Sequence, residues 1–211
     1  MFEESIQHLS KDKHLGQFIK RHGPLLPRRE HSNNVFRALA ESIVYQQLSG
    51  KAAAVILKRF VSLFPLTSQK ATKGEQQSFP TPQQVLAIKI EKLRSAGLSN
   101  QKATYLKDLA AKFKEGTVSP RGIQKMSDEE VIVHVTKVKG VGVWTAQMFL
   151  MFTLGRPDVL PVGDLGIQKG FKKLFKLKTL PTPAQMERLS KNWAGHRSAA
   201  CFYLWRLLDE K

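Results

Sequence analysis

The nine residues VKGVGVWTA, 138–146, predict a tight hairpin between two helices. A capping box formed by Ser127 and Glu130 begins the first helix, because each of these side chains satisfies an amide group at the helix start. The second helix begins within the quoted stretch, continues through an apolar run and ends at Gly155. Residues 138–142 are therefore assigned to the connection.

Two glycines one residue apart suit this hairpin to an anion. Gly140 and Gly142 permit positive φ and leave no side chain between the backbone and a ligand. The amide groups of the hairpin and of the next helical turn lie at the positive end of a helix dipole, where a phosphate oxygen fits. Lys139 adds positive charge beside them. An αα-hairpin without a ligand is the alternative, and it would be preferred for an isolated G-x-G pattern.

The charge of the whole chain favours the phosphate hypothesis. The 211 residues include 34 Lys and Arg against 17 Asp and Glu, a formal net charge of +17, and 42% are hydrophobic. So large an excess of basic residues in a folded protein is typical of proteins that bind a polyanion. We expect nucleic acid and no membrane, because the sequence has no basic amphipathic helix with a Trp/Leu-rich face and no run of about twenty apolar residues. A merely solvated basic surface is the alternative.

The single cysteine, Cys201, excludes an internal disulfide and a four-cysteine iron–sulfur or zinc site. We expect a buried structural thiol there and no cofactor. The acidic start, Met1 to Glu4, is unlike a signal peptide. We therefore expect an intracellular monomer, in a bacterial cytoplasm or a eukaryotic nucleus.

Periodicity predicts an all-α fold of about ten short helices. Apolar residues recur at three- and four-residue steps in segments 35–44 and 55–64. Thr81 and Thr182 each precede a proline, the pattern of a capping residue followed by a first-turn proline. Segment 65–80 is polar, has a proline at each end and lacks periodicity, which predicts a surface loop.

Four stretches, taken in order, resemble the helix-hairpin-helix DNA glycosylase superfamily, in which a Gly/Pro-rich loop and an aspartate follow the hairpin. They are ESIVYQQLSGKAA at 41–53, VKGVGVWTA, DVLPVGDLGIQKGF at 158–171 and HRSAACFYLW at 196–205. Together they span most of residues 34–207. They are most similar to the DNA-3-methyladenine glycosylase II type, in a short version without an N-terminal β-domain.

The resemblance implies two helical lobes with a DNA-binding cleft. Residues 34–155 would form a central lobe with the wedge segment and the helix-hairpin-helix. Residues 1–33 and 156–211, from the two ends of the chain, would form the second lobe, with Asp164 facing the cleft.

Asp164 is the candidate catalytic residue. Its position after Pro161 and Gly163 and before an amphipathic segment is that of a helix N-cap, which by itself would be its whole role. A carboxylate at a helix N-terminus is favoured in its ionised form. The resemblance implies that Asp164 also stabilises the positive charge that develops on the sugar and orients or deprotonates the attacking water.

Trp144 stands where superfamily members that also cut the strand carry a catalytic lysine. An amine could form a Schiff base with the sugar, whereas an indole cannot, so the resemblance implies a glycosylase without lyase activity. Trp144 and Tyr45 would then line the base pocket, where an aromatic face attracts a cationic base. His196 aligns with an aromatic pocket residue of relatives. A core tryptophan and a surface histidine are the alternatives.

The resemblance also assigns residues that would hold the DNA. Gln47 or Leu48 would fill the gap left by the flipped base, with Ser49, a histidine in some members, beside the minor groove. Core packing is the alternative for Leu48. Phosphate contacts are expected at Lys139, Gly140, Gly142, Lys51 and Lys102, and also at Lys169 and Arg197; a solvated charge is the alternative for each lysine and arginine. The hairpin carbonyls of Val138 and Val141 could hold a monovalent cation, although no metal is required.

The resulting hypothesis is a monofunctional DNA glycosylase that hydrolyses the N-glycosidic bond of alkylated purines in duplex DNA: 3-methyladenine, 7-methylguanine and, as an open possibility, ethenoadenine. This reaction begins base excision repair and needs no cofactor. One alternative is a non-enzymatic lesion-binding protein that resembles a glycosylase, which the serine at position 49 keeps open. Another is a helix-hairpin-helix module that binds DNA without recognising damage.

Overall fold

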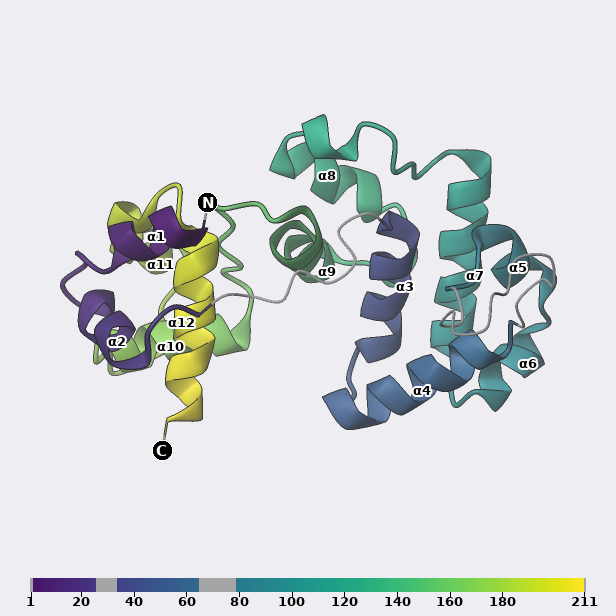
Figure 1. Cartoon of the computed structure of the whole chain (residues 1–211), viewed down its shortest axis with the longest axis horizontal. Helices are drawn as coiled ribbons and strands as arrows, with labels where there is room; N and C mark the ends of the chain where they lie inside the picture. The colour runs from purple at the N-terminus through teal and green to yellow at the C-terminus, as the bar shows by residue number, and fades with distance from the viewer. Residues whose placement is uncertain (1, 26–33, 65–78, 211) are drawn as a thin grey trace, which may run out of the picture. The chain divides into compact units, whose positions relative to one another are not determined.

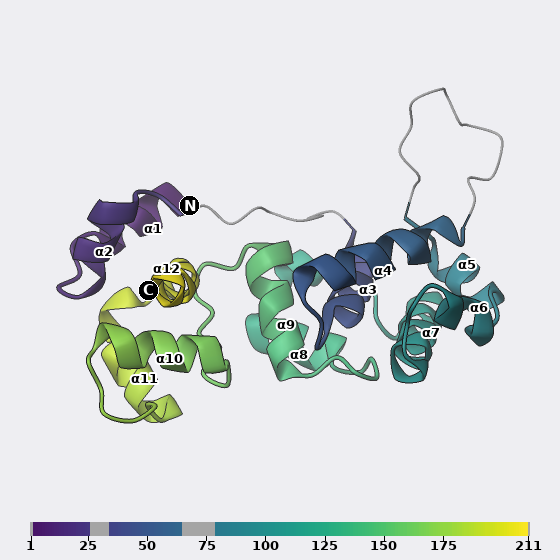
Figure 2. The same ribbon diagram turned by 90° about the horizontal axis from the view of Figure 1, so that it is seen from below.

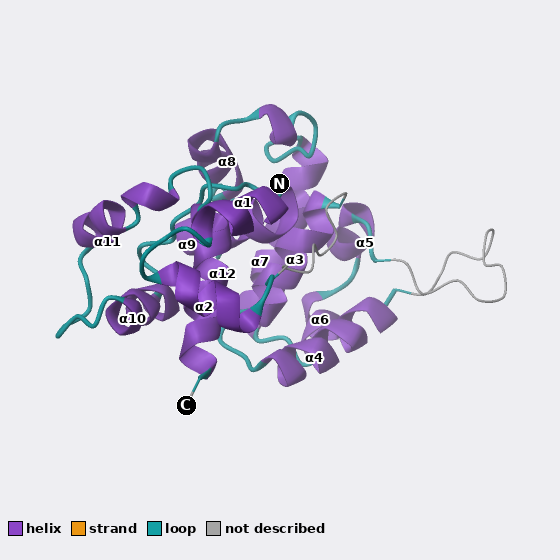
Figure 3. Cartoon of the chain, turned by 60° about the vertical axis from the view of Figure 1, so that its left-hand side comes forward, coloured by secondary structure: helices purple, strands orange, loops and turns teal. Residues whose placement is uncertain are grey.

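The computed structural model describes residues 2–25, 34–64 and 79–210, and every regular element in these ranges is a helix (Figures 1 and 3). The all-α prediction is therefore confirmed. The described residues form two compact units, one of residues 34–146 and one of residues 2–25 with 147–210. The sequence placed the boundary near residue 155, whereas the unit changes at Gln147, within a helix.

The unit of residues 34–146 is built around one long helix, α7 (Asn100–Glu115). Helix α3 (Val35–Tyr45) lies beside it, and α5 (Pro82–Ala87) packs on it as well (Figure 1). The other elements of this unit are α4 (Gly50–Ser62), α6 (Ile90–Ser95), the short 3₁₀ helix η1 (Ile123–Lys125), α8 (Asp128–Val135) and the first residues of α9 (Val143–Met148).

The core of this unit is formed by apolar residues at helical spacing. Leu39 and Ile43 of α3 and Leu106 and Leu109 of α7 are buried, and the two helices pack on each other. Phe36 of α3 packs edge-on against Phe113, near the end of α7, and against Phe79, with ring centroids 5.2 and 6.2 Å apart.

The second unit joins the two ends of the chain around helix α12 (Arg197–Asp209). Helices α10 (Leu165–Leu174), α1 (Phe2–Leu9) and α2 (Leu15–His22) all pack on α12 (Figure 2). The remaining elements are the π-helix η2 (Phe149–Leu154), α11 (Pro183–Leu189) and the 3₁₀ helix η3 (Lys191–Trp193). Trp193, Phe171 and Tyr203 are among the largest buried side chains of this unit.

The predicted helix starts are confirmed as local hydrogen-bonded caps. Ser127 and Glu130 form a capping box at the start of α8, as Thr81 does with Gln84 at α5. Thr182 forms the same box with Gln185 at α11. Each box satisfies two amide groups that the helix itself leaves without an acceptor.

Two further predictions concern single features. Most of the predicted surface loop, residues 65–78, lies outside the described residues. Cys201 is fully buried in α12, and burial raises the pKa of its thiol, as expected of a structural cysteine. Within the described ranges, none of the helices combines the length and apolar content needed to cross a membrane.

Candidate functional site

The hairpin predicted from VKGVGVWTA connects α8 and α9, which confirms the helix-hairpin-helix. Gly140 has φ +81°, a left-handed conformation that favours glycine. A Cβ atom at this residue would lie 2.1 Å from the ring of Tyr105, which lies on α7. The tyrosine ring therefore occupies the space that a side chain at residue 140 would need. Val138 and Val141 are buried, whereas Lys139 and Gly142 are exposed. The hairpin therefore anchors itself by its valines and presents its lysine and second glycine to solvent.

Helix α9 begins directly after this exposed glycine. The first amide groups of an α-helix have no acceptor within the helix, and they lie at the positive end of its dipole. Val143 and Trp144, in the first turn, are exposed. This geometry suits an anion at the hairpin, with Lys139 adjacent.

Two hydrogen bonds from other elements fix the hairpin backbone. The amide of Lys139 donates to Asp108 Oδ2 at 2.8 Å, and the carbonyl of Gly140 accepts from Gln46 Nε2 at 2.7 Å. Within the hairpin, the carbonyl of Val138 accepts from the amide of Val141 at 3.1 Å. A carbonyl oxygen has two lone pairs, so the Val138 carbonyl retains capacity for a cation. The monovalent cation at Val138 and Val141 stays a prediction.

The two aromatic residues predicted for a base pocket are both at the surface of their unit. Trp144 is 48% exposed and Tyr45, the last residue of α3, is 40% exposed. The alternative that Trp144 is a core residue is therefore wrong. The indole of Trp144 therefore reaches solvent on the first turn after the hairpin.

The predicted wedge residues lie in the turn between α3 and α4. Leu48 is 39% exposed, so the alternative of core packing is wrong for this residue. Gln47 has φ +55°, which costs a non-glycine residue about 1–2 kcal/mol. Ser49 caps α4, its hydroxyl accepting from the amide of Ala52 at 3.4 Å. The turn thus presents an apolar side chain to solvent on a strained backbone, as found at functional sites.

Asp164 is the N-cap of α10, as its sequence position indicates. Its Oδ1 accepts a hydrogen bond from the amide of Ile167 at 2.8 Å. The same oxygen accepts a second one from the indole Nε1 of Trp205, on α12, at 3.1 Å. The carboxylate therefore has one oxygen held by two donors from two helices, which fixes its orientation.

Trp205 belongs to an aromatic cluster beside this carboxylate. Its ring stacks on Phe152 of the π-helix η2, with centroids 6.0 Å apart and an interplanar angle of 19°. Phe202 completes the cluster, 5.9 Å from Trp205 and 5.4 Å from Phe152. A Cβ atom at Gly166 would lie 2.9 Å from Trp205 Cδ1 and 3.0 Å from Asp164 Oδ1. Glycine at this position therefore lets the indole approach the carboxylate.

Trp205 was not among the predicted site residues. It lies within the quoted stretch HRSAACFYLW, but 41 residues separate it from Asp164, and no local pattern links the two. Its spacing of three residues from Phe202 places both aromatic side chains on one face of α12, which was the available signal.

His196 lies at the start of α12, against the N-terminal helix. Its Nδ1 is 2.9 Å from Ser5 Oγ, and its ring centroid is 4.4 Å from that of His8. The predicted role in a base pocket stays a prediction, and these contacts give His196 a part in docking α1.

The predicted phosphate-binding side chains fall into two classes. Lys51, Lys139 and Lys169 are exposed. Lys102 donates instead to the carbonyls of Val44 at 2.7 Å and Gln46 at 2.6 Å, and burial lowers the pKa of its ammonium. Arg197 forms two hydrogen bonds to the carboxylate of Asp158, each 2.6 Å long, and the guanidinium lowers the pKa of that carboxyl.

The candidate residues therefore form two groups, one in each unit. Residues 34–146 hold the hairpin, Trp144, Tyr45 and the wedge residues, joined by the hydrogen bond from Gln46 to Gly140. Asp164, with Trp205 and its aromatic neighbours, belongs to the other unit, as does His196.

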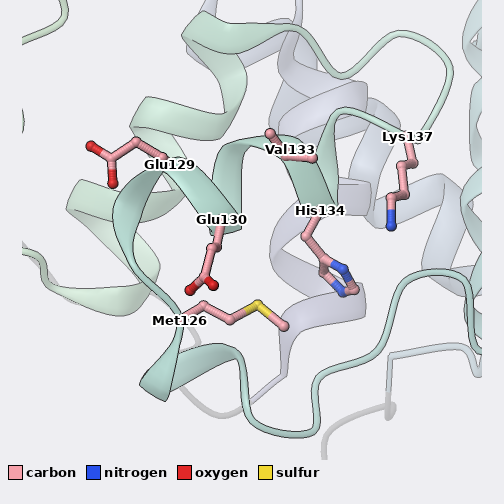
Figure 4. A pocket seen from close by; sticks show the side chains of 6 residues that line it. All are labelled: Met126, Glu129, Glu130, Val133, His134 and Lys137. Carbon is pink, nitrogen blue, oxygen red and sulfur yellow. The ribbon is translucent and has the colours of Figure 1, made fainter.

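A hollow of about 380 Å³ lies elsewhere, along α8 (Figure 4). The residues that line it come from 126–137, and no predicted site residue is among them: Met126, Glu129, Glu130, Val133, His134 and Lys137. Glu130 closes the capping box, and His134 Nε2 accepts from the amide of Ser119 at 3.0 Å. These side chains thus have structural roles.

Within residues 2–25, 34–64 and 79–210, no group of three or more His, Cys, Asp or Glu side chains is arranged to hold a metal ion. The chemistry available to the described residues is that of a fixed carboxylate beside aromatic rings, and that of a glycine hairpin with exposed lysines.

Comparison of the sequence and fold with known proteins finds similar DNA repair proteins. Residues 40–195 match the family described as HhH-GPD superfamily base excision DNA repair protein. DNA-3-methyladenine glycosylase 1 of Schizosaccharomyces pombe is 33% identical over 202 residues, which are 94% of this chain and 84% of the relative. The YfjP protein of Bacillus subtilis is also 33% identical, over 83% of this chain, and the chain spans only 60% of that relative.

The fold agrees with a solved relative. The Schizosaccharomyces pombe 3-methyladenine DNA glycosylase, in complex with abasic DNA, superimposes with a TM-score of 0.82 at 32% identity. The match covers 98% of this chain and 97% of the relative.

Proposed function

Because the chain belongs to the HhH-GPD superfamily of base excision DNA repair proteins, we propose that it hydrolyses the N-glycosidic bond of alkylated purines in duplex DNA. The observation that carries this proposal is the carboxylate of Asp164, held by the amide of Ile167 and the indole of Trp205. The relatives named as DNA-3-methyladenine glycosylases support the choice of substrate class.

The surroundings of Asp164 suit the chemistry of the reaction. Departure of the base leaves positive charge on the sugar, and a preoriented carboxylate stabilises that charge without having to reorganise. The same group can orient or deprotonate the attacking water. A purine nucleotide methylated at N3 or N7, as in 3-methyladenine and 7-methylguanine, already carries a positive charge on its base, which departs without a general acid, so one carboxylate is sufficient for these substrates.

We propose further that the enzyme leaves the DNA strand uncut. A lyase needs an amine that attacks the sugar, and the residue of the first turn after the hairpin is Trp144. The indole, with Tyr45, would instead contact the flipped base. Borohydride, which traps Schiff bases, should therefore leave no protein covalently attached to the DNA.

DNA would be held at the surface of the unit of residues 34–146. We assign phosphate contacts to Gly140, Gly142 and the exposed lysines Lys139 and Lys51. Leu48 or Gln47 would fill the gap left by the flipped base, with Ser49 beside the minor groove. The proposed activity would place the protein with the genome, in a bacterial cytoplasm or a eukaryotic nucleus.

The proposal is tested with duplexes that carry one 7-methylguanine or one 1,N6-ethenoadenine, compared with undamaged duplex. We expect the protein to release the free base from damaged duplex and to leave a strand that breaks only on heating with alkali. Tight binding to damaged duplex without base release would contradict the proposal and favour a lesion-binding protein. Equal binding to damaged and intact duplex, again without release, would favour a DNA-binding module.

A further inference from the structure

Helix α7 contacts both DNA-facing segments of its unit. These segments are the wedge segment (residues 46–49) and the hairpin (residues 138–142). Lys102, Tyr105 and Asp108 lie at three-residue steps along α7, so their side chains share one side of the helix. Lys102 contacts the wedge side, and the other two contact the hairpin.

The hairpin side of this arrangement is rigid. Tyr105 fills the space beside Gly140, and its hydroxyl accepts from Gln101 Nε2 at 2.6 Å, which fixes the ring. Asp108 accepts from the amide of Lys139 and also from Lys112 Nζ at 3.1 Å. Side chains of α7 therefore hold the hairpin backbone at two consecutive residues.

The wedge side is held by one ammonium group. Lys102 Nζ donates to the carbonyls of Val44 and Gln46, at the end of α3, where helix carbonyls lack internal donors. Two of its three N–H groups are thereby occupied, and the group is partly desolvated. Gln46 then donates from its side chain to the carbonyl of Gly140. The contacts form a closed loop from α7 through the wedge segment to the hairpin and back to α7.

The next residue is Gln47, which has a left-handed φ of +55°. This backbone conformation sets the direction in which the chain continues to Leu48. A strained residue persists only where its surroundings fix it. The fixing contacts here are those of Lys102 and Gln46, immediately before the strained residue.

We propose that Lys102 and Gln46 are positioning residues that hold the wedge segment in register with the phosphate-binding hairpin. The hairpin then binds the DNA phosphates at the same time as the wedge segment fills the gap left by the flipped base. The inference rests on the proposed function, because it presumes that a base leaves the stack. It also assigns Lys102 to the protein's own backbone, in place of the phosphate contact expected from the sequence.

The test compares three lysine-to-methionine variants, each of which keeps most of the stem and removes the ammonium. Lys102→Met removes the wedge contact. Lys139→Met removes an exposed charge at the hairpin. Lys107→Met is the matched structural control, because Lys107, five residues further along α7, donates in the same way to the carbonyls of Leu86 and Ile88 at the end of α5.

Three quantities are measured for each variant. The first is the dependence of binding to undamaged duplex on salt concentration. The second is the fluorescence change of 2-aminopurine next to a tetrahydrofuran abasic-site mimic, which reports insertion of the wedge without any chemistry. The third is the single-turnover rate of base release from a duplex that contains 7-methylguanine.

We expect Lys102→Met to keep wild-type binding and salt slope, to lose the fluorescence change and to slow base release between about 10- and 100-fold. Lys102→Arg, which can donate to both carbonyls, should restore both losses. Lys139→Met should lower the salt slope by about one, as loss of one phosphate contact requires. Lys107→Met should match wild type in all three quantities.

A salt slope lowered by about one in Lys102→Met, with the fluorescence change retained, would overturn the inference and restore the phosphate contact. If Lys102→Met does not fold, Gln46→Met provides the same test from the other side of the wedge segment, with the same expected losses. Should wild type change the fluorescence but release no base, the proposed glycosylase activity fails while the inference is still tested. No fluorescence change with wild type would overturn the inference.

Discussion

The indole Nε1 of Trp205 donates a hydrogen bond of 3.1 Å to Oδ1 of Asp164, the oxygen that also caps α10. Helix α12 thereby determines where the carboxylate at the start of α10 points. The stacking of Trp205 on Phe152 fixes the indole in turn. The orientation of the proposed catalytic group thus depends on a contact between residues 41 positions apart in the chain.

Trp205→Phe tests whether this hydrogen bond matters to the reaction. The variant keeps an aromatic ring against Phe152 and removes the only donor of the indole. A hydrogen bond to a charged group contributes about 1.5–3 kcal/mol, so we expect single-turnover base release to slow roughly 10- to 100-fold. Binding to the damaged duplex should change by less than about threefold, since the hydrogen bond is internal to the protein. A rate equal to that of wild type would show that the hydrogen bond from Trp205 is not needed to orient the carboxylate.

Gly166→Ala tests the same geometry without touching either partner. The added Cβ would lie 2.9 Å from Trp205 Cδ1 and 3.0 Å from Asp164 Oδ1, so one of the two must move. We expect base release to fall about tenfold or more, because catalysis is sensitive to small displacements. Gly163→Ala is the matched control: nothing lies within 4 Å of its Cβ, and its φ is not positive. Equal rates for the two alanine variants would contradict the account.

The hairpin makes a prediction about stability. In Gly140→Ala the new methyl group would meet the Tyr105 ring at 2.1 Å, on a backbone with φ +81°. We expect the free energy of unfolding in urea to fall by about 2–4 kcal/mol, the sum of left-handed strain and overpacking. Gly142→Ala has open space at its Cβ and should unfold within about 0.5 kcal/mol of wild type. Similar losses in the two variants would mean that Tyr105 does not fix the hairpin.

The pair Asp158–Arg197 makes a prediction about pH. Hydrogen bonds from Arg197 lower the pKa of Asp158 in the folded protein. The pair therefore stabilises the fold above the ordinary aspartate pKa near 4, and that contribution is lost as pH falls through the lower folded-state pKa. We expect the difference in unfolding free energy between wild type and Asp158→Asn to be constant from about pH 5 to 7 and to shrink below about pH 4.

Asp209→Asn is the comparison for this pH experiment. Asp209 forms an exposed ion pair with Arg206, 3.6 Å long, on the same helix as Arg197. Exposed pairs contribute little, so its difference from wild type should be near zero at every pH. A wild-type advantage over Asp158→Asn that grows as pH falls would contradict the assigned direction.

The sequence predicted those features that depend on neighbours a few residues away. Helix starts at Ser127, Thr81 and Thr182 could be predicted because a cap acts within three residues. The hairpin could be predicted for the same reason, since glycines and flanking helix signals are local. Asp164 was recognised as a cap by its position, and its proposed catalytic role came from the family resemblance.

Contacts between distant segments could not be predicted in this way. At Lys102 the sequence shows only a positive charge. It does not indicate that the ammonium group donates to carbonyls 56 and 58 residues earlier in the chain. In the sequence, Trp205 is indistinguishable from the other apolar residues of α12. The left-handed φ of Gln47 was equally hidden, because the strain is fixed by side chains that arrive from α7 and from Gln46 itself.

The most direct test of the central claim is single-turnover base release by Asp164→Asn. Asparagine also caps a helix and can accept from the amide of Ile167 and the indole of Trp205, so the variant removes charge while keeping the geometry. Asp12→Asn is the control for loss of a carboxylate that binds an indole elsewhere in the same unit. Asp12 accepts from the amide of Leu15 with Oδ1 and from the indole of Trp193 with Oδ2, so asparagine there loses charge and keeps only one of the two hydrogen bonds.

We predict that Asp164→Asn binds a duplex containing 7-methylguanine as wild type does but releases the base at least about 100-fold more slowly, whereas Asp12→Asn keeps the wild-type rate. Base release by Asp164→Asn within a few-fold of wild type would contradict the account, because the charge of Asp164 would then take no part in the reaction.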